Sequence, residues 1–244
     1  MIGLPMHVTV CLPTYNEREN LESMVRALGR ELREGDHVLV IDDASPDGTG
    51  VIADRLAIEL PFVRVLHRER KEGLGPAYIA GFRQALADGA ELVLQIDCDF
   101  SHDPADVPRL VEAAEGGADL VLGSRYVRGG SIPNWSIARR AVSRAGNLYA
   151  RLILQSPTHD LTGGFRCYRR RVLETIDLDA IQSKGYAFQI ECAYRIRRAG
   201  FRTVEVPITF IDRERGVSKM SRAIVLEAVW KVPRLRLRAL TGRL

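Results

Sequence analysis

Short runs of Val, Leu and Ile alternate with longer amphipathic segments through the first half of the chain. The apolar runs show no polar alternation, and each one precedes or follows a segment whose apolar positions recur with helical period. Such strands are typical of a parallel sheet that helices cover on both faces. We therefore expect an α/β fold with a mainly parallel central sheet, whose strands lie at 7–12, 36–41, 62–66, 91–96 and 119–123.

The pattern is less regular in the second half. It predicts an arginine-bearing helix at 137–155, a glycine-containing loop at 160–166, a helix at 186–199 and a strand at 201–206. No internal repeat or low-complexity linker interrupts the chain. We expect one domain over 1–220 and a basic C-terminal extension over 221–244.

Polar motifs follow three of the predicted strands, at 13–17, 42–49 and 97–99. Ligands bind open α/β sheets outside the carboxyl ends of their strands. The three motifs should therefore converge on one edge of the sheet. The Asp47-Gly48 pair is equally well explained as a turn that needs no ligand.

Asp97 and Asp99 directly follow the predicted strand at 91–96, whose Leu, Val and Ile residues indicate that it is buried. They point to the same side of an extended chain, and ionised carboxylates are costly there unless a cation or hydrogen-bond donors meet them. This arrangement favours a hard divalent cation that bridges to substrate phosphates. Helix capping is the alternative, and it accounts for Asp103 before Pro104 but not for Asp97 and Asp99.

The composition and the missing motifs exclude several classes of protein function. The chain has 244 residues, of which 46% are hydrophobic and 27% charged, with a net charge of +4, so a sizeable core is expected and nucleic acid is not implied. Four cysteines without a CxxC pair indicate reduced thiols. The sequence has no apolar stretch of membrane-spanning length, no signal-peptide pattern and no GxxxxGK[ST], GxGxxG or GxSxG motif. We expect a cytoplasmic protein.

In order along the chain, these motifs resemble the inverting nucleotide-sugar glycosyltransferases of family 2, which have the GT-A fold. Within that family, the chain most resembles the enzymes that transfer mannose to polyprenyl phosphates. The resemblance rests on PTYNE at 13–17, DDASPDGT at 42–49, DCDFSHDP at 97–104, GSRY at 123–126, WSIARR at 135–140, TGGFR at 162–166, YAFQIE at 186–191 and the stretch 212–219. The family usually has Ala and Leu where this chain has Cys98 and Phe100. The QxxRW signature of processive members is missing, which favours single transfer.

The resemblance implies GDP-mannose as donor, a polyprenyl phosphate as acceptor and Mg2+ or Mn2+ as cofactor. It implies a nucleotide-binding first half and an acceptor-side second half. The residues it assigns to the donor are Pro13, Tyr15, Glu17, Ile41, Asp43, Asp97, Cys98, Asp99, Ser101, Arg213 and Lys219. Asp97 and Asp99 would also bind the metal.

A phosphate acceptor is already anionic near neutral pH, so its attack on the sugar requires no strong general base. The site instead needs fixed cations for two anionic substrates and for the leaving nucleoside diphosphate. Basic positions of the resembled enzymes match Arg125, Arg139, Arg213 and Lys219. The resemblance therefore implies that these four residues and Asp99 are the catalytic residues, with Arg125 and Arg139 on the acceptor phosphate. The stretch 212–219 is typical of a loop that closes over donor, although an exposed turn would look the same.

Six basic residues and one acid alternate with apolar residues after position 221. Such a helix could lie on anionic lipid headgroups, or pack its apolar side on the core, and Pro233 should break or kink it. We expect peripheral contact with the cytosolic face of a membrane, with or without a membrane-anchoring protein partner. A glucosyltransferase that uses UDP-glucose, and a non-catalytic nucleotide-binding or membrane-scaffold protein on the same fold, remain as alternatives.

Overall fold

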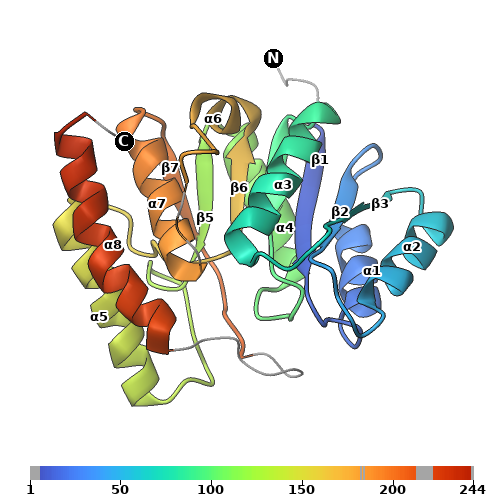
Figure 1. Ribbon diagram of the computed structural model, residues 1–244, viewed down its shortest axis with the longest axis horizontal. Helices are drawn as coiled ribbons and strands as arrows, with labels where there is room; N and C mark the ends of the chain where they lie inside the picture. Colours follow the sequence, from blue (N-terminus) through green and yellow to red (C-terminus); the bar gives the residue numbers. More distant parts are fainter. Residues whose placement is uncertain (1–5, 182, 184, 213–221, 243–244) are drawn as a thin grey trace.

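A mixed sheet of seven strands organises the described part of the chain (Figure 1). The computed structural model describes residues 6–181, 183, 185–212 and 222–242. The strand order is β3-β2-β1-β4-β6-β5-β7, and only β6 runs antiparallel to its neighbours. The strands are β1 (Val8–Thr14), β2 (His37–Asp42), β3 (Val63–His67), β4 (Leu92–Gln95), β5 (Leu120–Ser124), β6 (Arg166–Arg169) and β7 (Thr203–Pro207).

Helices cover both faces of the sheet, as the uninterrupted apolar strands predicted. In β1, Cys11 joins the core on one face of the sheet, whereas Val10 and Leu12 join the core on the other face. This alternation follows from the two-residue period of a strand. The helices are α1 (Leu21–Glu31), α2 (Thr49–Glu59), α3 (Leu74–Ala87), α4 (Val107–Glu115), α5 (Ile137–Leu154), α6 (Arg170–Thr175), α7 (Gly185–Arg198) and α8 (Arg222–Leu240), with a 3-10 turn at Pro104–Asp106.

The glycine-containing loop predicted at 160–166 ends in a strand that the sequence analysis did not predict. β6 pairs antiparallel with both β4 and β5. Its sequence, Arg-Cys-Tyr-Arg, has only two apolar residues, so it lacks the continuous apolar pattern of the parallel strands. The insertion of β6 separates β4 from β5 and places the loop before β6 next to the end of β4.

The C-terminal helix α8 lies beside α5 and α7 at one end of the molecule (Figure 1). Val232, Leu235 and Ala239 are buried in the core cluster that includes α5 and α7. The C-terminal segment was expected either to lie on lipid headgroups or to pack its apolar side on the core. These three residues pack on the core. None of the helices in the described residues combines the length and apolar character that a bilayer crossing requires.

The sequence analysis expected Pro233 to break or kink this helix. The break does not occur, since α8 is continuous from Arg222 to Leu240. Proline has no N–H to donate to the carbonyl four residues earlier, which belongs to Val229. The Tyr149 hydroxyl of α5 donates to that carbonyl over 2.7 Å. A neighbouring helix thus supplies the hydrogen bond that Pro233 removes.

Candidate active site

The carboxyl ends of β1, β2 and β4 border a cavity of about 520 Å3. β1 pairs in parallel with both β2 and β4, so the segments that follow these strands emerge side by side. Residues near the starts of α3 and α7 also line the cavity. The expected site residues that line it are Pro13, Tyr15, Glu17, Asp43, Asp97, Cys98, Asp99, Ser101 and Arg125. The three polar motifs therefore contribute to one site, as the strand pattern predicted.

Four expected residues are not among those that line the cavity. Ile41 is fully buried in the core cluster shared by the sheet and α3. Arg139 forms an ion pair with Asp212, and its guanidinium lies 4.0 Å from the ring centroid of Trp135. Arg213 and Lys219 lie outside the described residues.

The β1–β2 side of the cavity combines an aromatic ring with buried charge. The Lys71 ammonium lies 3.6 Å from the ring centroid of Tyr15. The Asp43 carboxylate is buried, pairs with Arg68 and accepts a hydrogen bond from the Gly73 N–H over 3.1 Å. A flat ring beside fixed polar groups is a suitable arrangement for a nucleoside.

Residues of the motif at 42–49 also accept hydrogen bonds from the backbone of the segment that follows β1. The Glu17 N–H donates to the Thr49 hydroxyl over 3.0 Å, and the Arg18 N–H donates to Asp47 over 3.3 Å. Asp47 also accepts from the Thr49 N–H over 3.0 Å. These contacts fit the alternative in which Asp47 and Gly48 form a turn, and neither residue lines the cavity.

Asp97 and Asp99 follow β4 and are fixed by different neighbours. The Tyr78 hydroxyl donates to Asp97 over 2.8 Å. Burial, reinforced by the Asp97 charge, raises the pKa of Tyr78 well above its ordinary value, so Tyr78 stays a donor. Asp99 accepts hydrogen bonds from the Ser101 N–H at 3.0 Å and from the Ser101 hydroxyl. Both carboxylates line the cavity.

This pair of carboxylates fits a hard divalent cation. Oxygen ligands are what Mg2+ and Mn2+ select, and Mg2+ usually keeps positions for water or phosphate oxygens. No cluster of three or more His, Cys, Asp or Glu side chains suited to a metal occurs in the part of the chain that the structure describes. Asp97 and Asp99 could hold a metal whose other ligands are phosphate oxygens or water. Asp103, by contrast, caps the turn at Pro104 by accepting from the Ala105 N–H, as expected.

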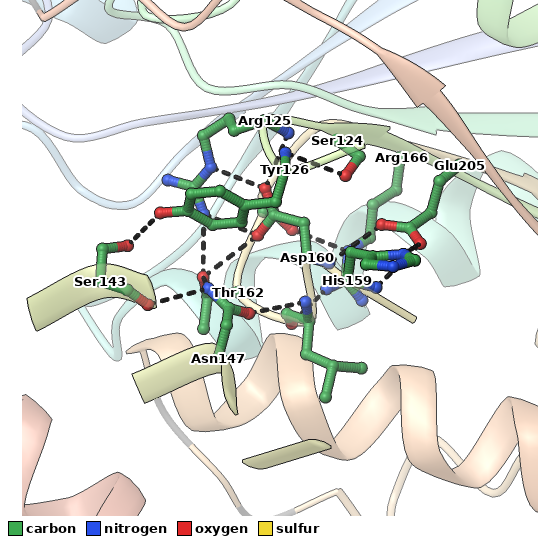
Figure 2. Close-up of polar contacts among 12 residues, drawn as sticks. Ser124, Arg125, Tyr126, Ser143, Asn147, His159, Asp160, Thr162, Arg166 and Glu205 are labelled. Carbon is green, nitrogen blue, oxygen red and sulfur yellow. Dashed lines mark hydrogen bonds and ion pairs between the residues drawn. The ribbon is translucent and has the colours of Figure 1, made fainter. Parts of the chain in front are cut away.

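Arg125 is a buried cation in the cavity wall, and Figure 2 shows its hydrogen-bond network. Its guanidinium makes two 2.7 Å hydrogen bonds to Asp160 and one of 2.8 Å to the Thr162 hydroxyl. Burial acts to raise the pKa of Asp160, but the charge and hydrogen bonds of Arg125 lower it overall. The two charges therefore persist as a buried ion pair.

The network fixes the loop that carries Asp160. Glu205 of β7 accepts hydrogen bonds from the His159 and Asp160 N–H groups over 2.8 and 2.9 Å. Asn147 of α5 accepts from the Leu161 N–H over 2.9 Å (Figure 2). Arg125 is thus a preorganised group, held in one orientation before any ligand binds.

His102 lines the cavity and is buried between two phenyl rings. Its ring centroid lies 5.4 Å from that of Phe165 and 5.1 Å from that of Phe210. Burial lowers its pKa to about 4, and the Arg125 charge adds to this effect while the Asp99 charge opposes it. The imidazole is therefore neutral at pH 7 and cannot serve there as a fixed cation.

Sequence reasoning missed Lys71, Tyr78 and Gln189 as site residues. Lys71 lies in a polar run after β3, so the rule that strand ends meet at one edge could have identified it. Tyr78 lies within an apolar helical pattern, and it supports Asp97 without lining the cavity itself. Gln189 belongs to the YAFQIE motif at 186–191, which was part of the resemblance but was given no role in the site.

The chain matches one protein family and two curated relatives over most of its length. The family described as Glycosyl transferase family 2 matches residues 9–177. The polyprenol monophosphomannose synthase of Mycolicibacterium smegmatis is 50% identical over 91% of this chain and 84% of its own length. The undecaprenyl-phosphate mannosyltransferase of Micrococcus luteus is 53% identical over 96% of both chains.

The fold also matches solved structures. A glucosyl-3-phosphoglycerate synthase from Mycobacterium tuberculosis, crystallised with Mn2+, UDP-glucose and phosphoglyceric acid, has a TM-score of 0.70 at 19% identity. The match covers 95% of this chain and 80% of the other. At this identity the likeness concerns the fold alone, and it supports the expected GT-A architecture. The matched family model and the two close relatives together show that this chain belongs to glycosyltransferase family 2.

Proposed function

We propose that this protein transfers mannose from GDP-mannose to the phosphate of a polyprenyl phosphate. The observation that carries the proposal is the similarity, over most of the chain, to two relatives whose names specify mannose and a polyprenyl acceptor. The cavity supports it, because an aromatic ring, two carboxylates and a buried arginine line the same cavity. The products would be polyprenyl-phosphate mannose and GDP.

The proposed reaction is a single displacement. A phosphate oxygen of the acceptor attacks the anomeric carbon, the bond from that carbon to the GDP oxygen breaks, and the configuration inverts. Because the nucleophile is an anion, none of the described residues has to remove a proton from it. Neutral His102 fits this scheme.

The residues of this chain would bind and orient the substrates. Tyr15 and Asp43 would contact the nucleoside, and Arg125 would orient the acceptor phosphate, with Arg139, Arg213 and Lys219 as further phosphate-binding cations. Asp97 and Asp99 would hold Mg2+ or Mn2+, with Cys98 and Ser101 beside the donor. When bound, this metal would neutralise charge on the diphosphate leaving group.

We also propose that the end of the molecule formed by α5 and α8 contacts the cytosolic face of a membrane. Large apolar side chains are exposed on both helices, namely Ile137, Val142, Leu148 and Leu152 on α5 and Val229, Trp230, Leu237 and Leu240 on α8. α5 contains four arginines and no acidic residue. Exposed apolar side chains with basic neighbours suit an anionic lipid surface, which is where a polyprenyl acceptor would be met.

The test of the enzymatic proposal is a transfer assay. Purified protein is incubated with GDP-mannose, a short polyprenyl phosphate and Mg2+ or Mn2+, with UDP-glucose as the competing donor. We expect lipid-linked mannose, and we expect Asp99→Ala to reduce its formation by at least about a hundredfold, because the developing charge loses its stabilisation. Transfer of glucose would refute the proposed donor. Donor binding by Asp99→Ala with metal dependence and affinity unchanged would refute the role of Asp99.

A further inference from the structure

Gln189 is a buried carboxamide in the cavity wall whose hydrogen-bonding atoms are unpaired. It lies in α7, its exposed fraction is 2%, and it lines the cavity. Neither Oε1 nor Nε2 has a hydrogen-bond partner within the described residues. Leaving a buried donor and acceptor unpaired destabilises a fold, so such a group calls for a specific explanation.

The surrounding structure holds Gln189 in this position. Arg166 is fully buried and donates to the Gln189 carbonyl over 2.8 Å. The same guanidinium donates to the carbonyls of Gly163, over 2.8 Å, and Leu161, over 2.9 Å. Arg166 therefore ties α7 to the glycine-containing loop before β6. The amide is presented on a fixed backbone, which is how binding groups are preorganised.

The amide lies beside Asp97. A Cβ built on Gly164 would be 3.3 Å from the Asp97 carboxylate oxygen Oδ2 and 3.9 Å from Gln189 Nε2. Gly164 itself lines the cavity. A side chain on Gly164 would crowd Asp97, so Asp97, Gly164 and Gln189 lie close together in the cavity wall.

The order of groups along the sheet indicates which part of a nucleotide sugar would reach this part of the cavity. Tyr15 and Asp43 lie at β1 and β2, Asp97 and Asp99 follow β4, and Gln189 lies next to Gly164 before β6. A nucleotide sugar has its nucleoside, diphosphate and hexose in the same order. With the nucleoside near Tyr15 and the diphosphate near the carboxylates, the hexose lies at Gln189.

The chemistry of the amide agrees with that position. A phosphate oxygen only accepts hydrogen bonds, so it would leave Oε1 unpaired, whereas a sugar hydroxyl both donates and accepts. Two neighbouring hydroxyls would satisfy Oε1 and Nε2 together. The amide also adds no charge to a wall that already contains two carboxylates.

We infer that Gln189 binds hydroxyl groups of the donor's hexose and is a specificity-determining residue for the sugar. The inference rests on the proposed function, since it assumes a nucleotide-sugar donor in this cavity. It separates recognition of the sugar from recognition of the nucleoside diphosphate, and that separation can be measured.

The test compares the affinities for GDP-mannose and GDP, by calorimetry with Mg2+, in the wild-type protein and in Gln189→Met. Methionine has a similar length and no hydrogen-bonding demand. We expect the Kd for GDP-mannose to rise about tenfold or more, because the bound hydroxyls lose their partner, while the Kd for GDP changes less than about twofold. The thermal midpoint should stay the same or rise, since an unpaired buried amide is removed.

Gln95→Met is the matched control. Gln95 is also a buried glutamine with an unpaired Nε2, but it accepts a 3.0 Å hydrogen bond from the Tyr168 hydroxyl and is not among the residues that line the cavity. Its replacement should lower the thermal midpoint and leave the ratio of the two affinities unchanged.

Equal effects of Gln189→Met on both affinities, or no effect on either, would overturn the inference. If that variant does not fold, Gln189→Asn keeps the amide and shortens its reach, and it should show the same selective loss. Failure of both variants to fold would make Gln189 a structural residue and the inference wrong. If the wild-type protein binds UDP-glucose instead of GDP-mannose, the proposed donor is wrong, and the comparison of UDP-glucose with UDP tests Gln189 separately.

Discussion

At the scale of single residues, His102 illustrates how burial determines the protonation state of a group in the cavity wall. Its pKa is lowered to about 4 from an ordinary value near 6.5, chiefly because burial penalises the charged ring. Between pH 6.5 and about pH 4, the His102 imidazole is therefore protonated in the unfolded chain and neutral in the folded protein. The free energy of unfolding must therefore decrease as the pH is lowered through this window.

We predict that the free energy of unfolding decreases by up to about 3 kcal/mol between pH 6.5 and pH 4 because of His102. His102→Gln cannot take up this proton, so its stability should depend less on pH in the same window. Urea denaturation in metal-free buffer at several pH values measures both slopes. Parallel slopes in the two proteins would show that the buried imidazole is not the cause.

How far the site could be predicted also depends on individual residues. Asp97 and Asp99 were predicted to lie in the site because charged side chains contradict their apolar surroundings in the sequence. Gln189 and Tyr78 carry no such contradiction, since a single polar group in an amphipathic helix is ordinary. Tertiary packing decides that Gln189 lines the cavity and that Tyr78 reaches Asp97.

At the scale of elements, continuous apolar patterns predicted the parallel strands and the long helices well. The helix expected at 137–155 is α5, Ile137–Leu154, and the helix expected at 186–199 is α7, Gly185–Arg198. β6 could not be predicted in this way, because it is four residues long and begins and ends with arginine. Its antiparallel pairing with β4 and β5 stabilises it, and those strands are distant in sequence.

The continuity of α8 through Pro233 rests on a hydrogen bond from another helix, and this can be tested. Tyr149→Phe removes the hydroxyl that donates to the Val229 carbonyl. We predict that this change lowers the free energy of unfolding by about 1 kcal/mol, a typical value for one hydrogen bond. In a Pro233→Ala background, the Ala N–H can donate to the same carbonyl. Tyr149→Phe should then lower the free energy of unfolding by much less.

Urea denaturation of the four proteins in this double-mutant cycle measures the coupling between Tyr149 and Pro233. A coupling close to the full cost of Tyr149→Phe is expected. An equal cost in both backgrounds would mean that the tyrosine hydroxyl does not compensate for the proline.

At the scale of the whole molecule, exposed apolar residues concentrate at one end of the sheet. Leu148 and Leu152 of α5 are one helical turn apart and are 52% and 68% exposed, and Trp230 of α8 is 72% exposed. The two helices lie side by side (Figure 1). Large exposed apolar side chains on adjacent basic helices are typical of a surface that contacts a membrane or another protein.

We predict that the protein binds vesicles containing anionic phospholipid, and that Leu152→Ser combined with Trp230→Ser weakens this binding about tenfold or more, because two apolar side chains no longer enter the lipid interface. Sedimentation with vesicles measures the partition, which should fall as salt screens the basic residues. Val51→Ser with Ile58→Ser is the matched control, since these residues are 73% and 88% exposed on α2, at the opposite end of the sheet. Equal loss in both variants would mean that the α5–α8 end has no special role. If the wild-type protein binds no anionic vesicle, lipid is not the partner of this surface, and the remaining candidate is a protein that anchors the chain at the membrane.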